Sequence, residues 1–169
     1  MTGDELRARQ APLKAKYKDD PKAAQLVLRA RAKLDTDSVT AVVETSPSPT
    51  VAGLHPATGG SGQEACSGDM LLQALVGCAG VTLGAVAKAM ALDVRAGDVL
   101  AEGDLDFRGT LAVSKEAPVG FTAVRLRFEL DTDATDEQVA KLIQLTERYC
   151  VVAQTIRAAV PVTSTAARR

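Results

Sequence analysis

The chain has 169 residues, of which 46% are apolar and 24% charged, and its mass of 17.6 kDa suits one globular domain with its own core. A formal net charge of −1 and an aromatic content of 3% without Trp argue against nucleic-acid binding. Because His55 is the only histidine, any metal site that needs two imidazoles from one chain is excluded.

The cysteine pattern and the absence of an apolar leader indicate a cytoplasmic protein. An odd number of widely separated cysteines without a CxxC spacing does not form the framework of a secreted, disulfide-rich domain. These cysteines are Cys66, Cys78 and Cys150. The apolar stretch 70–92 is long enough to span a bilayer, but Gln73 and Lys88 interrupt it. We therefore expect a core helix, no membrane contact and thiols that are held reduced.

Charge divides the chain into two parts. Residues 1–34 hold nine Lys/Arg against four Asp/Glu, a net charge of +5, whereas the remaining residues hold 11 against 17, a net charge of −6. We predict a basic helical extension over 1–34 and a second, main domain over 35–169. The extension is interpreted either as a solvated helical lead-in or as an arm that docks on the body or on a second subunit.

The first half of the chain predicts helices followed by strands. Pro21 suits the first turn of a helix, and the β-branched run SVTAVVET suits a strand. In chain order, we expect helices over 6–17 and 21–33, a strand over 38–45, a turn over 46–49, a strand over 50–54 and a glycine-rich loop over 59–68.

The second half predicts two long helices with strands between them. Apolar and charged residues alternate through GFTAVRLRFELD, as in a strand with one buried face, and Thr135 with Gln138 forms a capping box. The expected elements are a helix over 69–92, one or two strands over 99–113, a strand over 120–131, a helix over 135–159 and an edge strand over 160–163.

Cys78 and Cys150 lie on the two predicted long helices. The helix of Cys78 is apolar on nearly every side and contains Gly77, Gly80 and Gly84, each of which costs about 1 kcal/mol relative to Ala, so close packing must compensate. Cys150 falls on the apolar stripe of its helix. The two cysteines either meet in the core or are simply small buried hydrophobic residues.

Two sequence motifs resemble those of the OsmC/Ohr family, and of its general OsmC-like branch in particular. SGDMLLQALVGC, which ends at Cys78 and continues as AGVTLGAVAKAM, resembles the first cysteine helix of the family. ERYCVVAQTI, which contains Cys150, resembles the second. The likeness covers roughly residues 35–165 and includes the strand between the motifs.

The resemblance implies an α+β fold with antiparallel sheets around two central helices, in an intertwined homodimer. It also implies a thiol peroxidase of the stress response that reduces small organic hydroperoxides without metal, flavin or haem. Cys78 would become a sulfenic acid, Cys150 would resolve it as a disulfide, and an external dithiol would reduce that disulfide. The expected apolar lining of the pocket is Leu72, Val76, Val81 and Leu83.

The chain departs from the family pattern at the group that ionises the thiol. The peroxidase branches use an arginine from an early strand, but no Lys or Arg occurs between Lys33 and Lys88. Asp69 sits near the position of the paired carboxylate, or is a plain helix-start acid. The candidate substitute cations are Arg29, Arg31, His55, Arg108, Arg125 and Arg127. Without a cation, the alternative function is a non-catalytic small-molecule binding protein.

Three further readings concern Cys66 and His55. Cys66 is either a competing resolving cysteine or a loop thiol without a role. His55 either bonds locally or polarises Cys78, which would give a Cys/His hydrolase of thioesters or esters. Three cysteines and one histidine also match the ligand count of a zinc site, although their spacing resembles no known finger.

Overall fold

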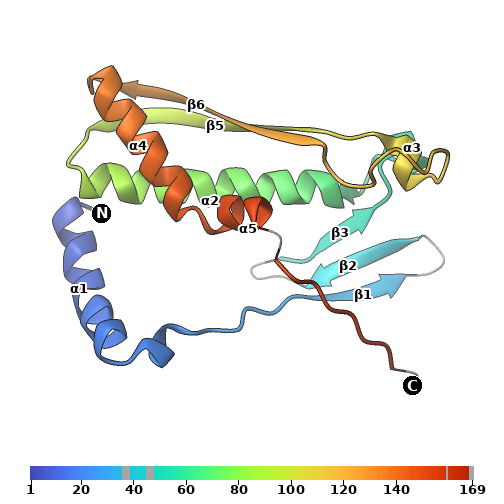
Figure 1. The fold of residues 1–169 in the computed structure, drawn as a ribbon, viewed down its shortest axis with the longest axis horizontal. Coiled ribbons are helices and arrows are strands. Elements are labelled where there is room, and N and C mark those ends of the chain that lie inside the picture. The colour runs from blue at the N-terminus through green and yellow to red at the C-terminus, as the bar shows by residue number, and fades with distance from the viewer. Residues whose placement is uncertain (36–38, 45–47, 159, 168–169) are drawn as a thin grey trace.

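The computed structural model describes residues 1–35, 39–44, 48–158 and 160–167, and Figure 1 shows one long helix between two separate sheets. The elements in chain order are α1 (Gly3–Asp19), the 3₁₀ turn η1 (Pro21–Ala24), β1 (Arg31–Asp35), β2 (Thr40–Glu44), β3 (Thr50–Gly53), the 3₁₀ turn η2 (Pro56–Thr58), β4 (Ala65–Cys66), α2 (Ser67–Ala89), β5 (Val94–Asp104), α3 (Phe107–Thr110), β6 (Ala123–Thr132), α4 (Asp136–Tyr149) and α5 (Val151–Arg157).

The two sheets lie at different places along α2. One has the order β1-β2-β3-β4, in which the first two pairs are antiparallel and the last is parallel. The other is the antiparallel pair β5-β6, which lies along one side of α2, while α4 and α5 cross another side (Figure 1). This mixed arrangement of sheets around helices confirms the predicted α+β class.

Several sequence predictions of single elements are confirmed. α1 contains the predicted helix 6–17, and its start is a capping box of Thr2 and Glu5. β2, β3 and α2 lie within or close to their predicted ranges. β6 alternates between partly buried and exposed residues, as its sequence indicates. Several predicted residues lie outside the described ones: 38 and 45 of the predicted strand 38–45, 46 and 47 of the predicted turn 46–49, and 159 of the predicted helix 135–159.

Four predicted elements differ from the structure. The helix over 21–33 is one 3₁₀ turn, Pro21–Ala24, followed by an extended segment and β1, because pairing with β2 holds residues 31–35 extended. The strand predicted within 99–113 is confirmed as part of β5, which begins earlier, and the rest of that range contains the short helix α3. The helix over 135–159 is divided into α4 and α5. Residues 160–163 form no strand.

The core lies where α2 meets α4, α5 and the β5-β6 sheet. One cluster of buried residues joins the middle of α2 to α5, and a second joins the later turns of α2 to α4. The first consists of Leu75, Ala79, Cys150 and Ala153, and the second of Leu83, Ala87 and Leu142. Thr135 and Gln138 form the predicted capping box at the start of α4. The cap fixes where α4 begins and thereby how its apolar stripe meets α2.

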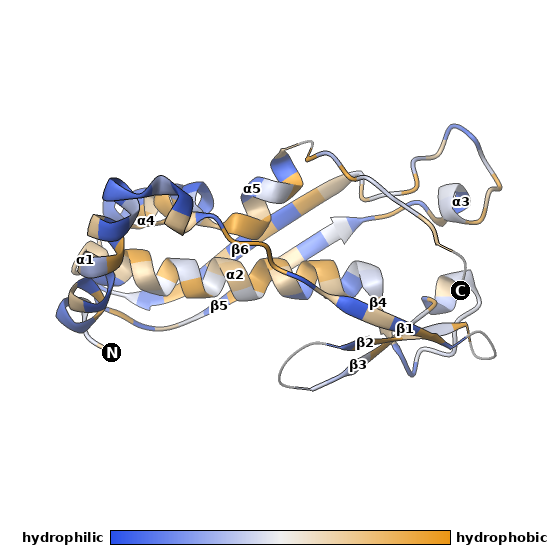
Figure 2. Cartoon of the chain, turned by 90° about the horizontal axis from the view of Figure 1, so that it is seen from below, coloured by the Kyte–Doolittle hydropathy of each residue, from blue (hydrophilic) through white to orange (hydrophobic). Residues whose placement is uncertain are grey.

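The remaining side of α2 is open. A Cβ added at Gly80 would lie 3.8 Å from Val99 of β5, but one added at Gly77 or Gly84 would meet no described atom within 4 Å. Val81 on this side is 77% exposed. Figure 2 shows that α2 is apolar along its length, and among the described residues it is the one helix long and apolar enough to cross a bilayer. The predicted packing reason for Gly77 and Gly84 is therefore not found within one chain.

Candidate functional site

The structure brings Cys78 and Cys150 together. Cys78 lies in the middle of α2 and packs against the buried cluster that contains Cys150 and Ala153. The two thiols share a hydrogen bond. Cys150 is fully buried, as its place on the apolar stripe predicted, while Cys78 is partly exposed. One sulfur of the pair is thus reachable from outside and the other is protected.

Cys150 is also the point at which the predicted long helix divides. Its backbone is extended (φ −72°, ψ 108°), so it ends α4 and begins α5. Its Sγ accepts a bond from the backbone N–H of Ala153 at 3.5 Å, which caps the new helix. Because the first N–H groups of a helix have no partner inside it, the start of α5 offers free donors beside the cysteine pair.

These donors lower the pKa of Cys78. Partial burial raises the pKa of the Cys78 thiol, but hydrogen bonds from the backbone N–H of Val152, the Cys150 thiol, the N–H of Val151 and the Thr82 hydroxyl together lower it further than burial raises it. The net pKa lies below the ordinary value of a cysteine. Donors that point at a sulfur favour its charged form. Sequence reasoning missed these groups because they belong to another helix and two of them are backbone.

The pKa of Cys150 moves in the opposite direction. Burial raises it most, and the neighbouring sulfur of Cys78 raises it further, against a lowering bond from the N–H of Ala153. The two shifts have opposite directions, so Cys78 ionises more readily than Cys150. A nucleophile and a resolving thiol differ in the same sense.

The expected cations lie elsewhere. None of the six candidates is among the groups that shift the pKa of Cys78 in the described part of the chain. Arg125 binds Asp104 at 2.6 Å and 2.7 Å on the exposed face of β6, and Arg108 binds Asp106. The other arginines pair with carboxylates or lie on the surface, as Arg127 does with Glu129, Arg31 with Glu44 and Arg29 with the Val27 carbonyl. Within the described part of one chain, the groups that lower the pKa of Cys78 are backbone, thiol and hydroxyl donors, and the expected activating cation stays a prediction.

Asp69 is not brought to the cysteine pair. It is an exposed residue in the first turn of α2. At 1.5 Å of rise per residue, it lies about 13 Å along the helix axis from Cys78. Within one chain its position fits the simpler of the two interpretations, a helix-start acid that complements the helix dipole.

Within one chain, the four residues of the predicted apolar lining do not share one wall. Leu83 is buried in the cluster with Leu142, whereas Val81 is 77% exposed. Leu72 and Val76 line a groove on another side of the helix with Leu100 and Ala101. These four side chains of α2 point in different directions because a helix turns by 100° per residue, so a run of apolar letters does not make one wall.

The apolar space beside the cysteine cluster comes instead from α5 and β6. A groove of about 190 Å³ is lined by Leu75, Val124, Leu126, Ala153 and Ile156, with Glu147 and Arg157 also on its wall. The two charged residues form an ion pair at 3.2 Å. Since Leu75 and Ala153 belong to the buried cluster around Cys150, this groove lies next to the thiol pair.

The beginning of α2 holds the third thiol and the histidine. Cys66 immediately precedes α2, makes no capping bond with its side chain, and shares a groove with His55, Asp69, Phe107 and Phe121. His55 stacks on Phe107 with ring centroids 4.9 Å apart, and its Nδ1 accepts from the N–H of Ala57 at 3.0 Å. His55 thus bonds locally and lies at the Cys66 end of α2. In the described ranges, no group of three His, Cys, Asp or Glu residues could hold a metal ion.

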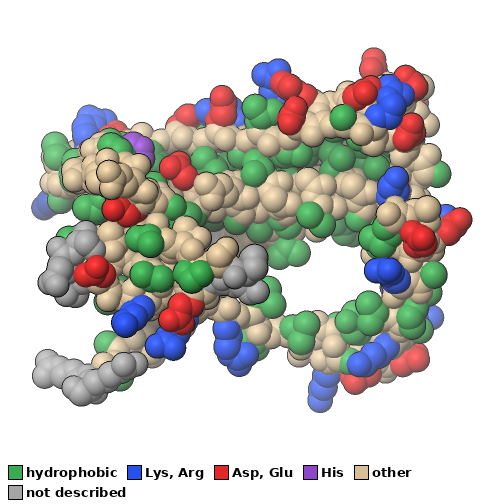
Figure 3. All heavy atoms as spheres, turned by 180° about the vertical axis from the view of Figure 1, so that it is seen from behind, with side chains coloured by type: hydrophobic (Ala, Val, Ile, Leu, Met, Phe, Trp, Pro, Cys, Tyr) green, Lys and Arg blue, Asp and Glu red, His purple; other side chains and the backbone are tan. Residues whose placement is uncertain are grey.

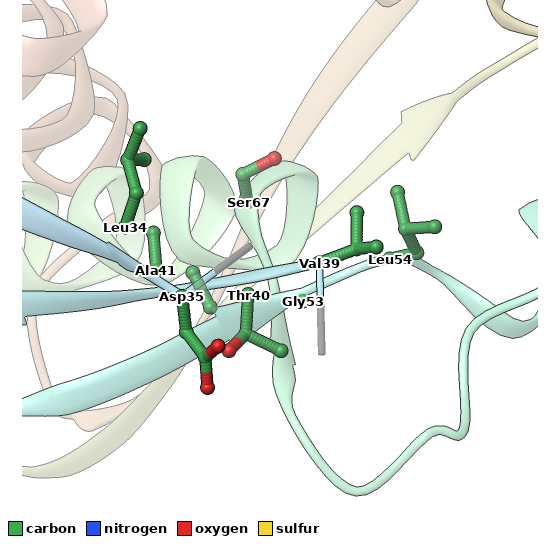
Figure 4. Close-up of a pocket in the computed structure, with 9 residues that line it drawn as sticks. Leu34, Asp35, Val39, Thr40, Ala41, Gly53, Leu54 and Ser67 are labelled. Atoms are coloured by element: carbon green, nitrogen blue, oxygen red, sulfur yellow. The ribbon is translucent and has the colours of Figure 1, made fainter. Parts of the chain in front are cut away.

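Cys66 cannot replace Cys150 as the partner of Cys78. The two cysteines are separated by twelve residues of α2, about 18 Å along its axis, whereas a disulfide needs Cα atoms within about 7 Å. A larger apolar groove of about 450 Å³ lies over the four-stranded sheet and reaches Ser67 at the start of α2 (Figure 4). It too is remote from Cys78 along the helix, and its walls include Leu34, Val39 and Leu54.

Comparisons with known proteins agree with this fold. Three solved structures superpose on about four fifths of the chain: an OsmC-like protein from Mycoplasma pneumoniae (TM-score 0.67, 14% identity, 80% of this chain and 90% of that one), an organic hydroperoxide resistance protein from Elizabethkingia anophelis (0.63, 16%, 80% and 91%) and another from Legionella pneumophila, described as a predicted redox protein (0.62, 15%, 79% and 92%). At these identities the likeness establishes the fold.

The comparison at the level of sequence identifies the family. No curated protein matches the chain significantly. The profile of OsmC-like proteins, however, matches residues 60–165, a range that includes α2 with Cys78 and the break at Cys150. This match covers more than half of the chain and includes both Cys78 and Cys150, so the chain belongs to the OsmC-like protein family.

Proposed function

We propose that the protein is a thiol peroxidase that reduces organic hydroperoxides with Cys78 as nucleophile and Cys150 as resolving thiol. The observation that carries this proposal is the paired environment of the two sulfurs. Donors from α5 and Thr82 lower the pKa of Cys78, while burial raises the pKa of its hydrogen-bonded neighbour. Family membership supports the same chemistry, since neighbours with this fold are named organic hydroperoxide resistance proteins.

The reaction balances with an external dithiol. The Cys78 thiolate attacks the terminal oxygen of the hydroperoxide, the O–O bond breaks, and the alkoxide leaves and takes a proton as an alcohol. The resulting sulfenic acid condenses with the Cys150 thiol, so that an S–S bond forms and water is released. A dithiol then reduces the disulfide through a mixed disulfide and is itself oxidised.

The proposal includes a homodimer. Gly77, Val81 and Gly84 form an open strip on α2 next to the turn that holds Cys78. Small residues let a second helix approach closely, and an apolar strip in water is unfavourable until it is covered. A second α2 would cover this strip and close the exposed side of Cys78. Because this chemistry needs reduced thiols at rest, we place the protein in the cytoplasm.

The decisive experiment measures the consumption of cumene hydroperoxide with dihydrolipoamide as the dithiol. The wild-type protein is expected to turn over, and Cys78→Ser to be inactive. Without the dithiol, Cys150→Ser should consume about one equivalent and keep the sulfenic acid at Cys78, because the internal resolving partner is missing. Peptide mapping after one equivalent of peroxide should find a Cys78–Cys150 disulfide in the wild type.

The competing function is a binding protein that holds a small apolar molecule without turnover. The absence of the candidate arginines from the Cys78 environment is the observation that favours it. Saturable binding of cumyl alcohol without peroxide consumption, and without a disulfide, would support it. It would also show that hydrogen-bond donors alone do not make Cys78 reactive.

A further inference from the structure

The groove at the start of α2 gathers most of the rings of this chain. The sequence has three Phe, two Tyr and one His, and no Trp. Two of the three Phe residues, Phe107 and Phe121, line this groove of about 260 Å³ together with His55. All three rings are only partly buried, and Figure 3 shows the one histidine, in purple, at the surface beside hydrophobic side chains. Part of their ring surface is therefore available to a ligand.

Two of the rings hold each other in place. His55 stacks on Phe107 with ring centroids 4.9 Å apart and 20° between the ring planes. Phe107 begins α3, which lies beside the N-terminal end of α2 in Figure 1. The Nδ1 of His55 accepts a bond from the N–H of Ala57 at 3.0 Å. Because a protonated imidazole has no acceptor nitrogen, this bond describes a neutral ring. His55 thus adds ring surface to the groove without adding positive charge.

The third ring is set between two glycines. A Cβ added at Gly103 of β5 would lie 2.5 Å from Cε1 of Phe121, so the ring rests directly on the strand backbone. A Cβ added at Gly68 of α2 would lie 3.5 Å from Cζ of the same ring and 3.7 Å from Sγ of Cys66. Phe121 therefore forms a fixed wall, and the missing side chain of Gly68 leaves space between this wall and the Cys66 thiol.

The charge of the groove is negative. Asp69 is the one acidic residue on its wall, and no Lys or Arg lines it. Among the described residues, no basic side chain forms an ion pair with Asp69. Arg108, which follows Phe107 in the chain, is bound to Asp106 instead. Since the faces of aromatic rings also carry negative potential, every charged or ring group on the wall favours a cation.

We propose that this groove binds a small organic cation with an alkylated ammonium group. Ring surfaces contact the alkyl groups and a carboxylate faces the positive charge, which is how aromatic sites recognise quaternary ammonium ligands. The volume lies near the lower end of the about 300–1,000 Å³ that is usual for ligand pockets, so the ligand is compact. The site goes beyond the proposed peroxidase, because Asp69 lies about 13 Å along the axis of α2 from Cys78.

The first test compares two probes of the same shape on the full-length protein. Choline carries a positive nitrogen where 3,3-dimethylbutan-1-ol carries a neutral carbon, and calorimetry should find choline bound at least about tenfold more tightly. Asp69→Asn should remove most of this difference. Asp98→Asn, an exposed carboxylate about 17 Å along β5 from Gly103, should preserve it. The proposal is overturned by equal affinities for the two probes, by no binding of choline, or by a preference that survives Asp69→Asn.

The second test locates the probe and needs no variant. Saturating choline should slow the alkylation of Cys66 by iodoacetamide at least about threefold and leave that of Cys78 unchanged, as measured by peptide mass spectrometry. Protection of Cys78 alone, or of neither cysteine, would place choline elsewhere and refute the site.

A ring variant completes the test. Phe107→Leu should lower the affinity for choline at least about fivefold, because a leucine side chain has no ring face. Tyr149→Leu removes an aromatic ring that is 57% exposed at the end of α4, away from the groove, and should leave the affinity unchanged. Equal affinities of Phe107→Leu and wild type would show that the rings do not hold the cation.

Discussion

The middle of α2 and its N-terminal end each hold a cysteine, and the two cysteines differ in what surrounds them. Around Cys66 stand the groups that usually suggest catalysis, His55 and Asp69, yet His55 bonds to Ala57 and stacks on Phe107. Around Cys78 there is no charged partner in the described structure, but there are donors from Val151, Val152, Thr82 and Cys150. The comparison teaches that directed hydrogen bonds, rather than nearby ionisable residues, lower the pKa of Cys78.

The largest expected difference between the two cysteines is in turnover. Cys78→Ser should lower kcat/KM for cumene hydroperoxide at least about 1,000-fold, which corresponds to ~4 kcal/mol of transition-state stabilisation. Cys66→Ser should change it less than about twofold, because Cys66 lies about 18 Å along α2 from the reacting sulfur. Steady-state kinetics with a saturating dithiol compare the two variants directly. A larger loss in Cys66→Ser than in Cys78→Ser would exchange their roles.

The preference for organic peroxide over hydrogen peroxide tests the surroundings of Cys78. The groove beside the thiol pair is lined by Leu75, Val124, Leu126, Ala153 and Ile156. Binding gains roughly 25 cal/mol of free energy for each Å² of alkyl surface that is removed from water. Hydrogen peroxide has no alkyl surface and gains nothing in this way. We expect kcat/KM for cumene hydroperoxide to exceed that for hydrogen peroxide at least about tenfold, or ~1.4 kcal/mol. Equal values in parallel assays would mean that the substrate does not use this groove.

The backbone donors can be removed one at a time. Val151 is the first residue of α5 and follows Cys150 in extended conformation, so Val151→Pro deletes one N–H at a position where proline is accepted. The lowered pKa of Cys78 should then rise, so less thiolate is present at neutral pH. We expect alkylation by iodoacetamide at pH 7 to slow roughly three- to tenfold.

The pH profile of this alkylation supplies the control. In wild type the midpoint for Cys78 should lie below that of an unperturbed cysteine, and it should move upward in Val151→Pro. Val151→Ala keeps the N–H and should leave the midpoint in place. A midpoint that is the same in all three proteins would mean that the amide of Val151 does not stabilise the thiolate.

The smallest effect is expected at Asp69. Asp69→Asn keeps the size of an exposed first-turn side chain and removes only its charge. We expect a change in kcat/KM below about twofold and a loss of stability near 0.5 kcal/mol, the usual contribution of an acid at a helix start. Thermal unfolding and peroxide kinetics measure both quantities. A loss of more than tenfold in activity alone would restore Asp69 to the catalytic site, through contacts made in the dimer.

Local sequence patterns were sufficient to predict much of the fold and to single out Cys78 and Cys150 as the candidate pair. The apolar run of α2, the alternation of β6 and the Thr135–Gln138 capping box are short-range features, because helix and strand periodicity is written into neighbouring residues. The placement of Cys150 on an inward stripe followed from the same periodicity. The two cysteine motifs then indicated the family from residues alone.

Only the tertiary structure decided which groups lower the pKa of Cys78. The sequence of 135–159 reads as one helix, and its break at Cys150 depends on the buried sulfur that caps α5 through Ala153. That break directs the amides of Val151 and Val152 to a sulfur more than seventy residues earlier in the chain. Every residue except proline has a backbone N–H, so the sequence does not show which of these groups will donate to a sulfur. Their effect exists only once packing has removed water and fixed their direction.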